Sequence, residues 1–597
     1  MGAFRLRLSA LPLSLLLLFA GRGVGSDIDG ATRKELVDDC PECEATEDAE
    51  ALTSLLQLTH AHRRGEHAED DDGPVGHCHG WECLKEYVVQ KDAAYTWADT
   101  GLRLNGVVDG VAWTGSLLNM TSQRWLSALD TKNPAWSHGM VVIRPGNLEG
   151  AQSSSGWATL YICLGWYGSE HGPGLAELRA DDADVQVAAA IAVKTGAPAA
   201  IVFAVPPQVD VLLDQIRRGE DDLLAHGQLR FLRSGGKKRW LAELPMTKAV
   251  VRAMDTVSNY TGSAWGADVR RFGLMGASKR GAASWHAAAV DSRVKAIVPM
   301  AKSLNTAAFL RRTLQSYGGM PVVAAPYMDR ALLVAGDQRS NSKMLAITDP
   351  ISYASRYSGV AKLVIDAAQD EYFMPDHTAL WWDRMPGPKS HLMVTEGGHI
   401  IGGSPVLSLV EPIVAFIRSQ QLGEAAPELN WTVNLTAGRI DAWLPPFGPM
   451  PSRVELWQAR TCDSSRRDFR LHNFDVGENC SRCGVQLPAP SPGAPPSPTC
   501  RNLAVKWSGS PIDAVLESQG RRWVAEVAAP QDGRWAAFFL QFEFPGPMPP
   551  QMAVDGHRMT WRLSTEVAVV PDTYPFSAPD SKATVAKSTP LVLLSDG

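Results

Sequence analysis

Two hydrophobic patterns alternate along residues 87–424. Short continuous apolar runs, such as "GMVVIRP" (139–145), are typical of strands that are buried on both faces. Between them lie segments such as 245–259, whose apolar residues repeat at i, i+3, i+4 and i+7 as in an amphipathic helix. We expect strands at 139–145, 158–165, 199–205, 269–275, 294–300, 362–367 and 391–396, and helices at 184–196, 245–259 and 405–419. The alternation predicts an α/β domain in which helices cover both faces of a mostly parallel sheet.

The pattern changes at about residue 428. From there on, apolar and polar residues alternate in short segments that are separated by turns. Strands are expected at 431–437, 538–544 and 565–570. Such segments predict a small all-β, sandwich-like domain over residues 428–597. The proline-rich stretch "LPAPSPGAPPSPT" (487–499) is expected to be an inserted loop within its cysteine-rich part.

The N-terminal residues show the pattern of a signal peptide. Arg5 and Arg7 precede the apolar run Leu8–Ala20, which is too short to span a bilayer. We therefore expect residues 1–25 to be removed. Residues 26–86 are acidic and contain cysteines, and we expect them to form a poorly packed leader. No later apolar run is long enough to cross a membrane, so we predict a secreted protein or one in the lumen of the secretory pathway.

Net charge and glycosylation signals fit that location. The net charge of −7 argues against nucleic acid as the main partner, because nucleic-acid binding usually needs a basic face. N-x-S/T sequons, which mark N-glycosylation sites in secreted proteins, occur five times. They lie at Asn119, Asn259, Asn430, Asn434 and Asn479.

The cysteines form two groups that flank the α/β domain. These are Cys40, Cys43, Cys78 and Cys83 before it, and Cys462, Cys480, Cys483 and Cys500 after it. In an oxidising compartment each group is expected to form two disulfides, with three possible pairings. The alternative is zinc, with ligands among His77, Cys78, His79 and Cys83 or from Cys40/Cys43 and Cys480/Cys483. We favour the disulfides and predict no metal and no cofactor. Cys163 stands alone in a strand pattern and is expected to be a buried free thiol.

A candidate nucleophile follows the predicted strand 269–275. The stretch "MGASKRG" resembles the G-x-S-x-G turn that presents a catalytic serine between a strand and a helix. Arg280 occupies the position of the final glycine, which arrives one residue later at Gly281. The small residues around Ser278 still allow a tight turn. The alternative is that Ser278 merely caps the helix.

A candidate acid and base follow the next strands in the order that an α/β-hydrolase requires. Asp370 comes just after strand 362–367, and His399 lies between glycines after strand 391–396. His399 would accept the proton of Ser278, and Asp370 would orient the imidazole and stabilise its charged form. Other candidates for the acid are Asp366, Glu371 and Asp376. We predict the triad Ser278, Asp370 and His399.

Two further roles concern the substrate. The backbone N–H of Lys279, at a helix N-terminus, is expected to bind the oxyanion, with a second donor from the loop around Trp166. Lys279 and Arg280 are expected to point toward the pocket mouth, where their charge would suit an anionic substrate. The alternative is a solvated basic pair. The substrate itself could be a small molecule, a glycan or a peptide.

Several segments together resemble a known family. They are "RWLSALDTKNPAWSH" (124–138), "LAELPMTKAVVRAMDTV" (241–257), "GASKRGAASWHAAAVDSRVKAIVPM" (276–300), "DEYFMPD" (370–376) and "VELWQARTCDSSRRDFRL" (454–471). They resemble the PhoPQ-activated pathogenicity-related family, whose eukaryotic branch includes autocrine proliferation repressor proteins. The resemblance implies an α/β-hydrolase-like domain followed by a small β domain, with the family's serine motif on Ser278 and its acidic loop on Asp370.

Three functions stay open at this point. The first is a secreted serine hydrolase that transfers acyl groups from esters or peptides. The second, suggested by the family, is a secreted growth-repressing signal that binds a cell-surface receptor on a hydrolase scaffold. The third is a carbohydrate-directed esterase, because the serine turn is also similar to that of glucuronoyl esterases.

Overall fold

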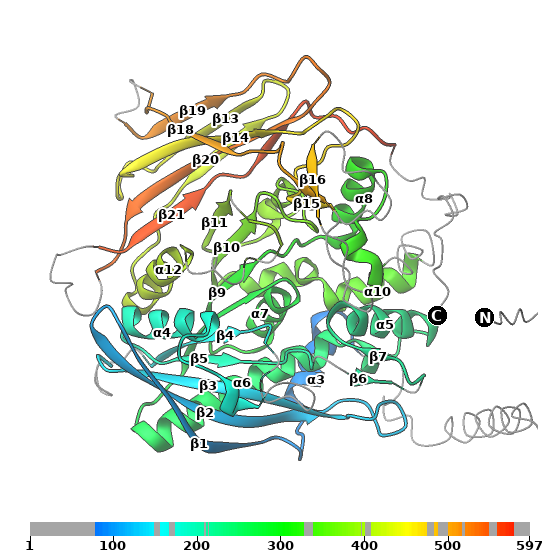
Figure 1. The fold of residues 1–597 in the computed structure, drawn as a ribbon, viewed down its shortest axis with the longest axis vertical. Coiled ribbons are helices and arrows are strands. Elements are labelled where there is room, and N and C mark those ends of the chain that lie inside the picture. Colours follow the sequence, from blue (N-terminus) through cyan, green and yellow to red (C-terminus); the bar gives the residue numbers. More distant parts are fainter. Residues whose placement is uncertain are drawn as a thin grey trace, which may run out of the picture. The chain divides into compact units, whose positions relative to one another are not determined.

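A computed structural model of the chain shows how these elements are arranged (Figure 1). It describes residues 78–148, 156–165, 167, 174–207, 210–212, 214–327, 338–395, 397–399, 401, 408–473, 483–487, 500–515, 520–548 and 558–577. All of them belong to one compact unit, Pro74–Gly597. The predicted signal peptide, most of the leader, and nearly all of the proline-rich insertion lie outside the described residues. None of the described helices has the length and apolar character that a membrane crossing requires.

A nine-stranded sheet forms the centre of the α/β domain. Its strands are β1 (Thr96–Val108), β2 (Val111–Arg124), β3 (Ala135–Pro145), β4 (Trp157–Ile162), β5 (Ala199–Val202), β8 (Arg271–Ala277), β9 (Val294–Met300), β10 (Ala361–Ala367) and β11 (Lys389–Val394). Their order is β1-β2-β3-β5-β4-β8-β9-β10-β11. The strands from β5 to β11 run parallel, whereas β1, β2 and β3 pair antiparallel. This confirms the predicted mostly parallel sheet, with an antiparallel edge in addition.

Helices cover both faces of this sheet, as predicted. Helices α4 (Ala183–Thr195) and α12 (Val410–Leu422) share one hydrophobic cluster, and α3 (Trp81–Val89), α6 (Glu243–Trp265) and α7 (Lys279–Val290) share the other. Successive residues of a strand pack alternately into the two clusters, as Leu274 and Met275 of β8 do. This explains why the strands read as continuous apolar runs rather than as alternating ones. Helices α5 (Glu220–Arg233), α8 (Thr306–Tyr317) and α10 (Gln338–Thr348) lie in the connections.

Two elements at the start of the described chain differ from expectation. The hairpin β1–β2 was not predicted, because most of the side chains of β1 are polar or exposed. Its tight turn is Asp109-Gly110, a pair with φ of 48° and 77° that is typical of a two-residue hairpin. Helix α3 contains the expected end of the leader at residue 86, and its Leu84 is fully buried. The α/β domain therefore begins earlier than we expected.

The C-terminal strands form packed β-sheets. One sheet has the order β12 (Asn430–Asn434), β13 (Arg439–Trp443) and β19 (Arg522–Glu526), and another has β18 (Ser508–Pro511), β14 (Arg453–Arg460), β20 (Ala536–Pro545) and β21 (Thr560–Ser564), with β22 (Ala568–Val570) also on β20. Trp523 of the first sheet meets Phe542 of the second at a ring distance of 5.1 Å. The predicted sandwich-like domain is thus confirmed. A small third sheet has the order β15 (His472–Asn473), β17 (Cys500–Asn502) and β16 (Gly484–Gln486).

Strand β20 also connects the β domain to the α/β domain. Its Phe538 and Phe542 face one hydrophobic cluster, while Phe539 packs in a different cluster with Ala368 and Met393. The backbone N–H of Met393 donates a hydrogen bond of 3.1 Å to Ser564 Oγ of β21. The β domain therefore lies against β11, the last strand of the central sheet, close to the carboxyl ends of β10 and β11.

Candidate active site

Ser278 lies in a sharp turn between β8 and α7. Its φ of 56° and ψ of −124° are outside the regions that a residue with a side chain normally adopts. A hydrogen bond of 2.8 Å from its backbone N–H to the carbonyl oxygen of Met300 ties the turn to β9. Such strain is typical of a nucleophile elbow, which exposes the serine at the carboxyl edge of the sheet.

The two glycines of the turn are required by close packing. A Cβ atom on Gly276 would lie 2.8 Å from the carbonyl oxygen of Arg280. A Cβ atom on Gly281 would lie 3.1 Å from the carbonyl oxygens of both Gly276 and Met300. The displaced glycine therefore lies where α7 packs tightly against Gly276 of β8 and Met300 of β9. Arg280 is tolerated one residue earlier because its side chain leads away toward α5.

The structure brings Ser278, His399 and Asp370 together. His399 Nε2 lies 2.9 Å from Ser278 Oγ, and His399 Nδ1 lies 2.9 Å and 3.0 Å from the two carboxylate oxygens of Asp370. These distances are those of a nucleophile, a base and an orienting acid. The Asp370 side chain is almost fully buried, whereas 12% of the His399 side chain is exposed.

The loop after β10 holds the acid and flanks the base. Asp370 Oδ1 accepts hydrogen bonds from the backbone N–H groups of Tyr372 (2.6 Å) and Phe373 (3.0 Å). The ring of Tyr372 lies 4.2 Å from the His399 ring, and that of Phe373 lies 5.5 Å away. These contacts limit the orientations that both the carboxylate and the imidazole can adopt.

The other candidate acids have different partners. Asp366 lies 3.2 Å from both His377 and His391, and all three are buried. Asp376 binds Arg467. Glu371 does contact His399, but through the backbone N–H rather than the imidazole. Of the four candidates, only Asp370 is hydrogen-bonded to the imidazole of His399.

Lys279 and Arg280 do not face a pocket mouth as solvated charges. The Arg280 side chain is 4% exposed and forms an ion pair with Glu220 of α5. Lys279 Nζ lies 2.8 Å from Glu220 and 3.1 Å from Asp221. Burial alone would raise the pKa of Glu220, but Arg280 and Lys279 lower it to about 2. Both cations are thus neutralised, and they connect the start of α7 to the start of α5.

Sequence reasoning missed the roles of Glu220 and Asp221. The sequence indicates only that Lys279 and Arg280 oppose the dipole at the start of α7 and so need acidic partners, without showing which acids these are. The hydroxyl of Tyr327 donates a further hydrogen bond of 2.6 Å to Asp221.

The expected oxyanion donors are only partly described. Lys279 is the first residue of α7, and first-turn N–H groups have no acceptor within their own helix. The second donor was expected from the loop after β4. Its Gly165 and Tyr167 are described, but Trp166 lies outside the described residues.

Disulfides account for the described cysteines of both groups. Cys78 pairs with Cys83, and Cys462 pairs with Cys483. Cys500 is also disulfide-bonded. Cys40, Cys43 and Cys480 lie outside the described residues, and Cys163 is a buried free thiol, as expected.

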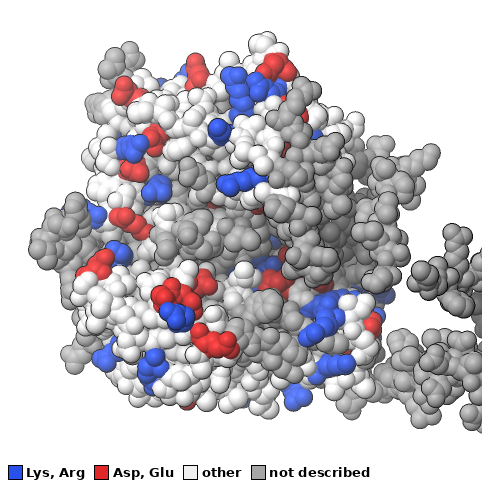
Figure 2. All heavy atoms as spheres, in the orientation of Figure 1, with Lys and Arg blue, Asp and Glu red and all other residues white. Residues whose placement is uncertain are grey.

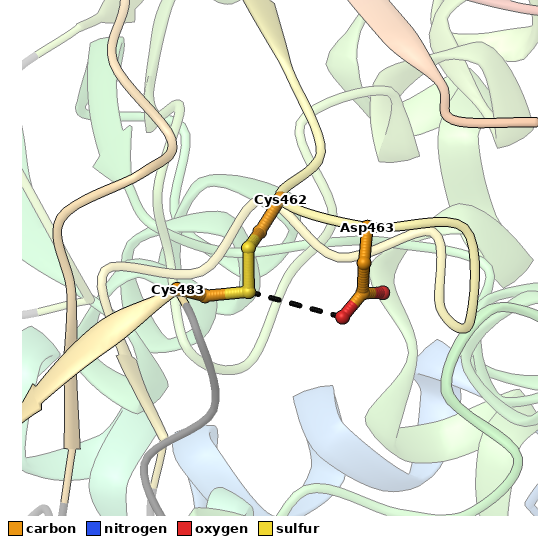
Figure 3. Close-up of side chains that lie close together, drawn as sticks. All are labelled: Cys462, Asp463 and Cys483. Atoms are coloured by element: carbon orange, nitrogen blue, oxygen red, sulfur yellow. Dashed lines mark hydrogen bonds between the residues drawn. A yellow bond between two sulfur atoms is a disulfide. The ribbon is translucent and has the colours of Figure 1, made fainter. Parts of the chain in front are cut away.

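The metal alternative can be judged at one of these pairs. Figure 3 shows Asp463 beside the Cys462–Cys483 disulfide, with Asp463 Oδ2 3.8 Å from Cys483 Sγ. These three residues are near enough to one another to suggest a metal site. Because the two sulfurs are bonded to each other, neither is a thiolate ligand.

The charges and most of the sequons can be located on the surface of the described residues. Figure 2 shows acidic and basic side chains interspersed on the face that it draws, without one large basic field. Among the predicted glycosylation sites, Asn119, Asn259 and Asn434 are exposed and Asn430 is half-buried. Asn479 lies outside the described residues.

The chain is similar to several known proteins. A sequence model of the PhoPQ-activated pathogenicity-related protein family matches residues 84–470. Autocrine proliferation repressor protein A of Dictyostelium discoideum is 28% identical over 504 residues, which cover 83% of this chain and 92% of that protein. Among solved structures, the chain is similar to an acetyl xylan esterase from Paenibacillus sp. R4, with 16% identity, a TM-score of 0.35, and coverage of 57% of this chain and 92% of that one. It is also similar to a glucuronoyl esterase from Solibacter usitatus, with 13% identity, a TM-score of 0.34, and coverage of 57% and 91%.

The family match extends over more than half of the chain and includes Ser278, Asp370 and His399. The chain therefore belongs to the PhoPQ-activated pathogenicity-related protein family.

Proposed function

We propose that this protein is a secreted serine hydrolase that cleaves a carboxylic ester or a related acyl compound. The observation that carries the proposal is the hydrogen-bonded chain from Ser278 through His399 to Asp370, with Ser278 in a strained turn. A serine that merely capped α7 would have no need of a histidine at 2.9 Å, and its side chain makes no capping hydrogen bond.

The geometry supports an acyl-transfer mechanism. His399 accepts the Ser278 proton at Nε2 as Ser278 Oγ attacks the substrate carbonyl carbon. Asp370 accepts the hydrogen bond from Nδ1–H, which keeps the required tautomer and stabilises the imidazolium. The tetrahedral oxyanion lies toward the Lys279 N–H at the start of α7. His399 then donates its proton to the leaving group, and water releases the acyl group from Ser278 by the reverse steps.

Labelling with a fluorophosphonate probe tests the proposal. The probe should phosphonylate Ser278 in the wild-type protein and leave Ser278→Ala unlabelled. Ser284→Ala is a suitable control, because Ser284 is a buried serine in the middle of α7 that bonds the carbonyl oxygen of Arg280. Equal labelling of wild type and Ser278→Ala would contradict the proposal.

Secretion is part of the proposal and rests on independent features. The Cys78–Cys83 and Cys462–Cys483 disulfides suit an oxidising compartment, and exposed sequons suit glycosylation. The full chain expressed in eukaryotic cells should appear in the medium. An endoglycosidase should reduce its apparent mass. Retention in the cytosol at the unglycosylated mass would contradict secretion.

A positively charged side chain supports an anionic substrate. Lys302 follows β9 at the same edge of the sheet as Ser278, and its Nζ lies 6.0 Å from the Phe373 ring centre, beside His399. Burial lowers the pKa of Lys302, although Asp349 and Glu243 oppose this. Within the described part of the chain, Lys302 forms neither an ion pair nor a hydrogen bond, unlike Lys279 and Arg280. We therefore assign the role that we expected of Lys279 and Arg280 to Lys302.

The second candidate function is growth-repressing signalling through a receptor. It is favoured by the 28% identity to a protein named as an autocrine proliferation repressor, which spans most of both chains. Purified wild type and Ser278→Ala can be compared in a proliferation assay. Equal repression by both would favour receptor binding, whereas loss of repression in Ser278→Ala would make signalling depend on hydrolysis.

A further inference from the structure

We infer that Glu371 and His472 are positioning residues for the catalytic base, so that the C-terminal β domain completes the active site. The inference rests on the proposed function, since it concerns the same triad. Neither residue touches the reacting atoms. They act through the backbone of His399.

One carboxylate connects the two domains. Glu371 Oε2 accepts a hydrogen bond of 2.6 Å from the backbone N–H of His399. Glu371 Oε1 lies 2.8 Å from His472 Nδ1 on β15 of the C-terminal region. Glu371 directly follows the catalytic Asp370, so the same loop presents one acid to the imidazole and the next acid to the backbone of the same histidine.

The Glu371 carboxylate is stabilised in its charged form. Burial raises its pKa, but the hydrogen bonds from His472 and from the His399 N–H lower it, and the net shift is downward. Glu371 is only 6% exposed, whereas 26% of the His472 side chain is exposed. Hydrogen bonds to a buried charged acceptor are roughly twice as strong as neutral ones, so this contact holds the His399 backbone firmly.

Gly398 leaves the space next to the His399 backbone that the Glu371 carboxylate occupies. A Cβ atom at Gly398 would lie 2.5 Å and 2.6 Å from the two oxygens of Glu371. The φ of Gly398 is not in the left-handed region, so the backbone itself does not require glycine there. Glycine at this position therefore serves the approach of Glu371. This gives a physical reason for the second glycine of "EGGHI".

The β domain is held firmly enough to act as a support. The backbone N–H of Leu471, next to His472, donates a hydrogen bond of 2.9 Å to the carbonyl oxygen of Gln369, next to Asp370. Gln369 Nε2 in turn donates a bond of 3.1 Å to the carbonyl oxygen of Val505. At the far end of the same loop, the buried Arg467 binds Asp376 with two hydrogen bonds. The loop that carries the acid is thus fastened to the β domain on both sides.

Loss of this support should slow the chemical step more than it weakens substrate binding. A catalytic group displaced by about 1 Å can cost on the order of 100-fold in rate. We expect His472→Ala and Glu371→Ala to lower both kcat for 4-nitrophenyl acetate and the rate of fluorophosphonate labelling by about 10- to 100-fold. KM should change by less than about twofold, because neither residue contacts the substrate. His472→Asn should recover much of the rate, since its amide nitrogen can take the place of Nδ1 and donate to Glu371.

Two controls separate positioning from general damage to the β domain. Arg522→Ala removes an ion pair with Asp441 within the sandwich, far along the chain from the triad, and should leave the rate unchanged. Gly398→Ala should slow the enzyme alone, but should add nothing to Glu371→Ala, because the clash disappears with the carboxylate. Full additivity of these two changes would overturn the inference.

Hydrogen exchange at the His399 amide makes the inference testable even if the protein proves not to be a hydrolase. This amide is bonded to Glu371, so its exchange should accelerate at least about tenfold in His472→Ala and Glu371→Ala and stay unchanged in Arg522→Ala. Absence of labelling in the wild type would contradict the proposed function alone. Unchanged exchange and an unchanged labelling rate in His472→Ala would overturn the inference alone.

Discussion

The two halves of the proposed triad are supported by different parts of the chain. Ser278 is held by β8, α7 and β9, which follow one another within residues 271–300. Asp370 and His399 lie on two loops. The loop of Asp370 is held by Arg467, which binds Asp376 91 residues earlier in the chain, and by His472, which binds Glu371 101 residues earlier. The proposed nucleophile is therefore built by a local motif, and the proposed acid–base pair is built by contact between two domains.

This difference separates two kinds of requirement. The elbow needs small residues where backbone segments approach each other, as at Gly276 and Gly281. The acid–base loops need hydrogen-bonding partners brought in from the β domain, such as Arg467 and His472. Substitutions at the elbow should therefore act on the nucleophile or on stability, whereas substitutions in the loops should act on the geometry of the base.

The largest effect on the acid–base half is expected from Asp370→Asn. The amide keeps the shape of the carboxylate but favours the wrong tautomer of His399, so the rate of Ser278 labelling should fall by about 10⁴-fold. The labelling rate can be measured beside that of Asp513→Asn, at an exposed aspartate of the β domain. A rate above a tenth of the wild type in Asp370→Asn would show that Asp370 is not the acid of the triad.

On the elbow half, Glu220→Gln should act mainly on stability. It leaves the buried Arg280 without its charged partner, which should cost about 3 kcal/mol of unfolding free energy in urea. The pKa of Glu220 is lowered from 4.5 to about 2, so its ionised form stabilises the folded state. This contribution is complete above about pH 4.5 and is lost as the pH falls toward 2.

The control for that prediction is Asp181→Asn, which removes an exposed ion pair with Arg179. Its urea midpoint should match that of the wild type at every pH tested. If Glu220→Gln proved as stable as Asp181→Asn at pH 7, the ion pairs with Arg280 and Lys279 would not connect α5 to the elbow in the way that we describe.

The smallest effect is expected from a substitution of Lys302, which follows β9 of the elbow half and lies near Phe373 of the acid–base half. Lys302→Gln should raise KM about tenfold for an ester that carries a carboxylate, and should leave KM for a neutral ester of the same size unchanged. Lys343→Gln, at an exposed lysine of α10, is the matched control. Equal changes for both esters would exclude Lys302 as the group that recognises an anion.

Much of the fold could be predicted from sequence, and so could the three residues that the structure brings together at the candidate site. Strand β9 has the predicted bounds, and α4 ends at Gly196 in the left-handed conformation, as its sequence indicated. Ser278, Asp370 and His399 could be found because parallel strands place their carboxyl ends at one edge of the sheet. The hairpin β1–β2 was missed because its first strand lacks a regular apolar face.

The supporting residues could not be found in the same way. Nothing in the local sequence of His472 indicates that it meets Glu371. The acids at 220–221 stand beside the arginines at 217–218, so the sequence gives no reason to pair them with Lys279 and Arg280 instead. We expected Lys279 and Arg280 to lie at the pocket mouth, but α5 covers both side chains. A cation at the start of a helix does not show which distant segment will pack over it.

By itself, the sequence determined the α/β sheet, the tight serine turn and the order of the three proposed catalytic residues, because hydrophobic period and small-residue packing act between near neighbours in the chain. Only the tertiary structure decided which charges are neutralised and which residues hold the base. Glu220 meets Arg280 and Glu371 meets His472 because the packing of α5 and of the β domain brings distant segments together. The energy of those contacts depends on burial and distance, which a linear pattern does not contain.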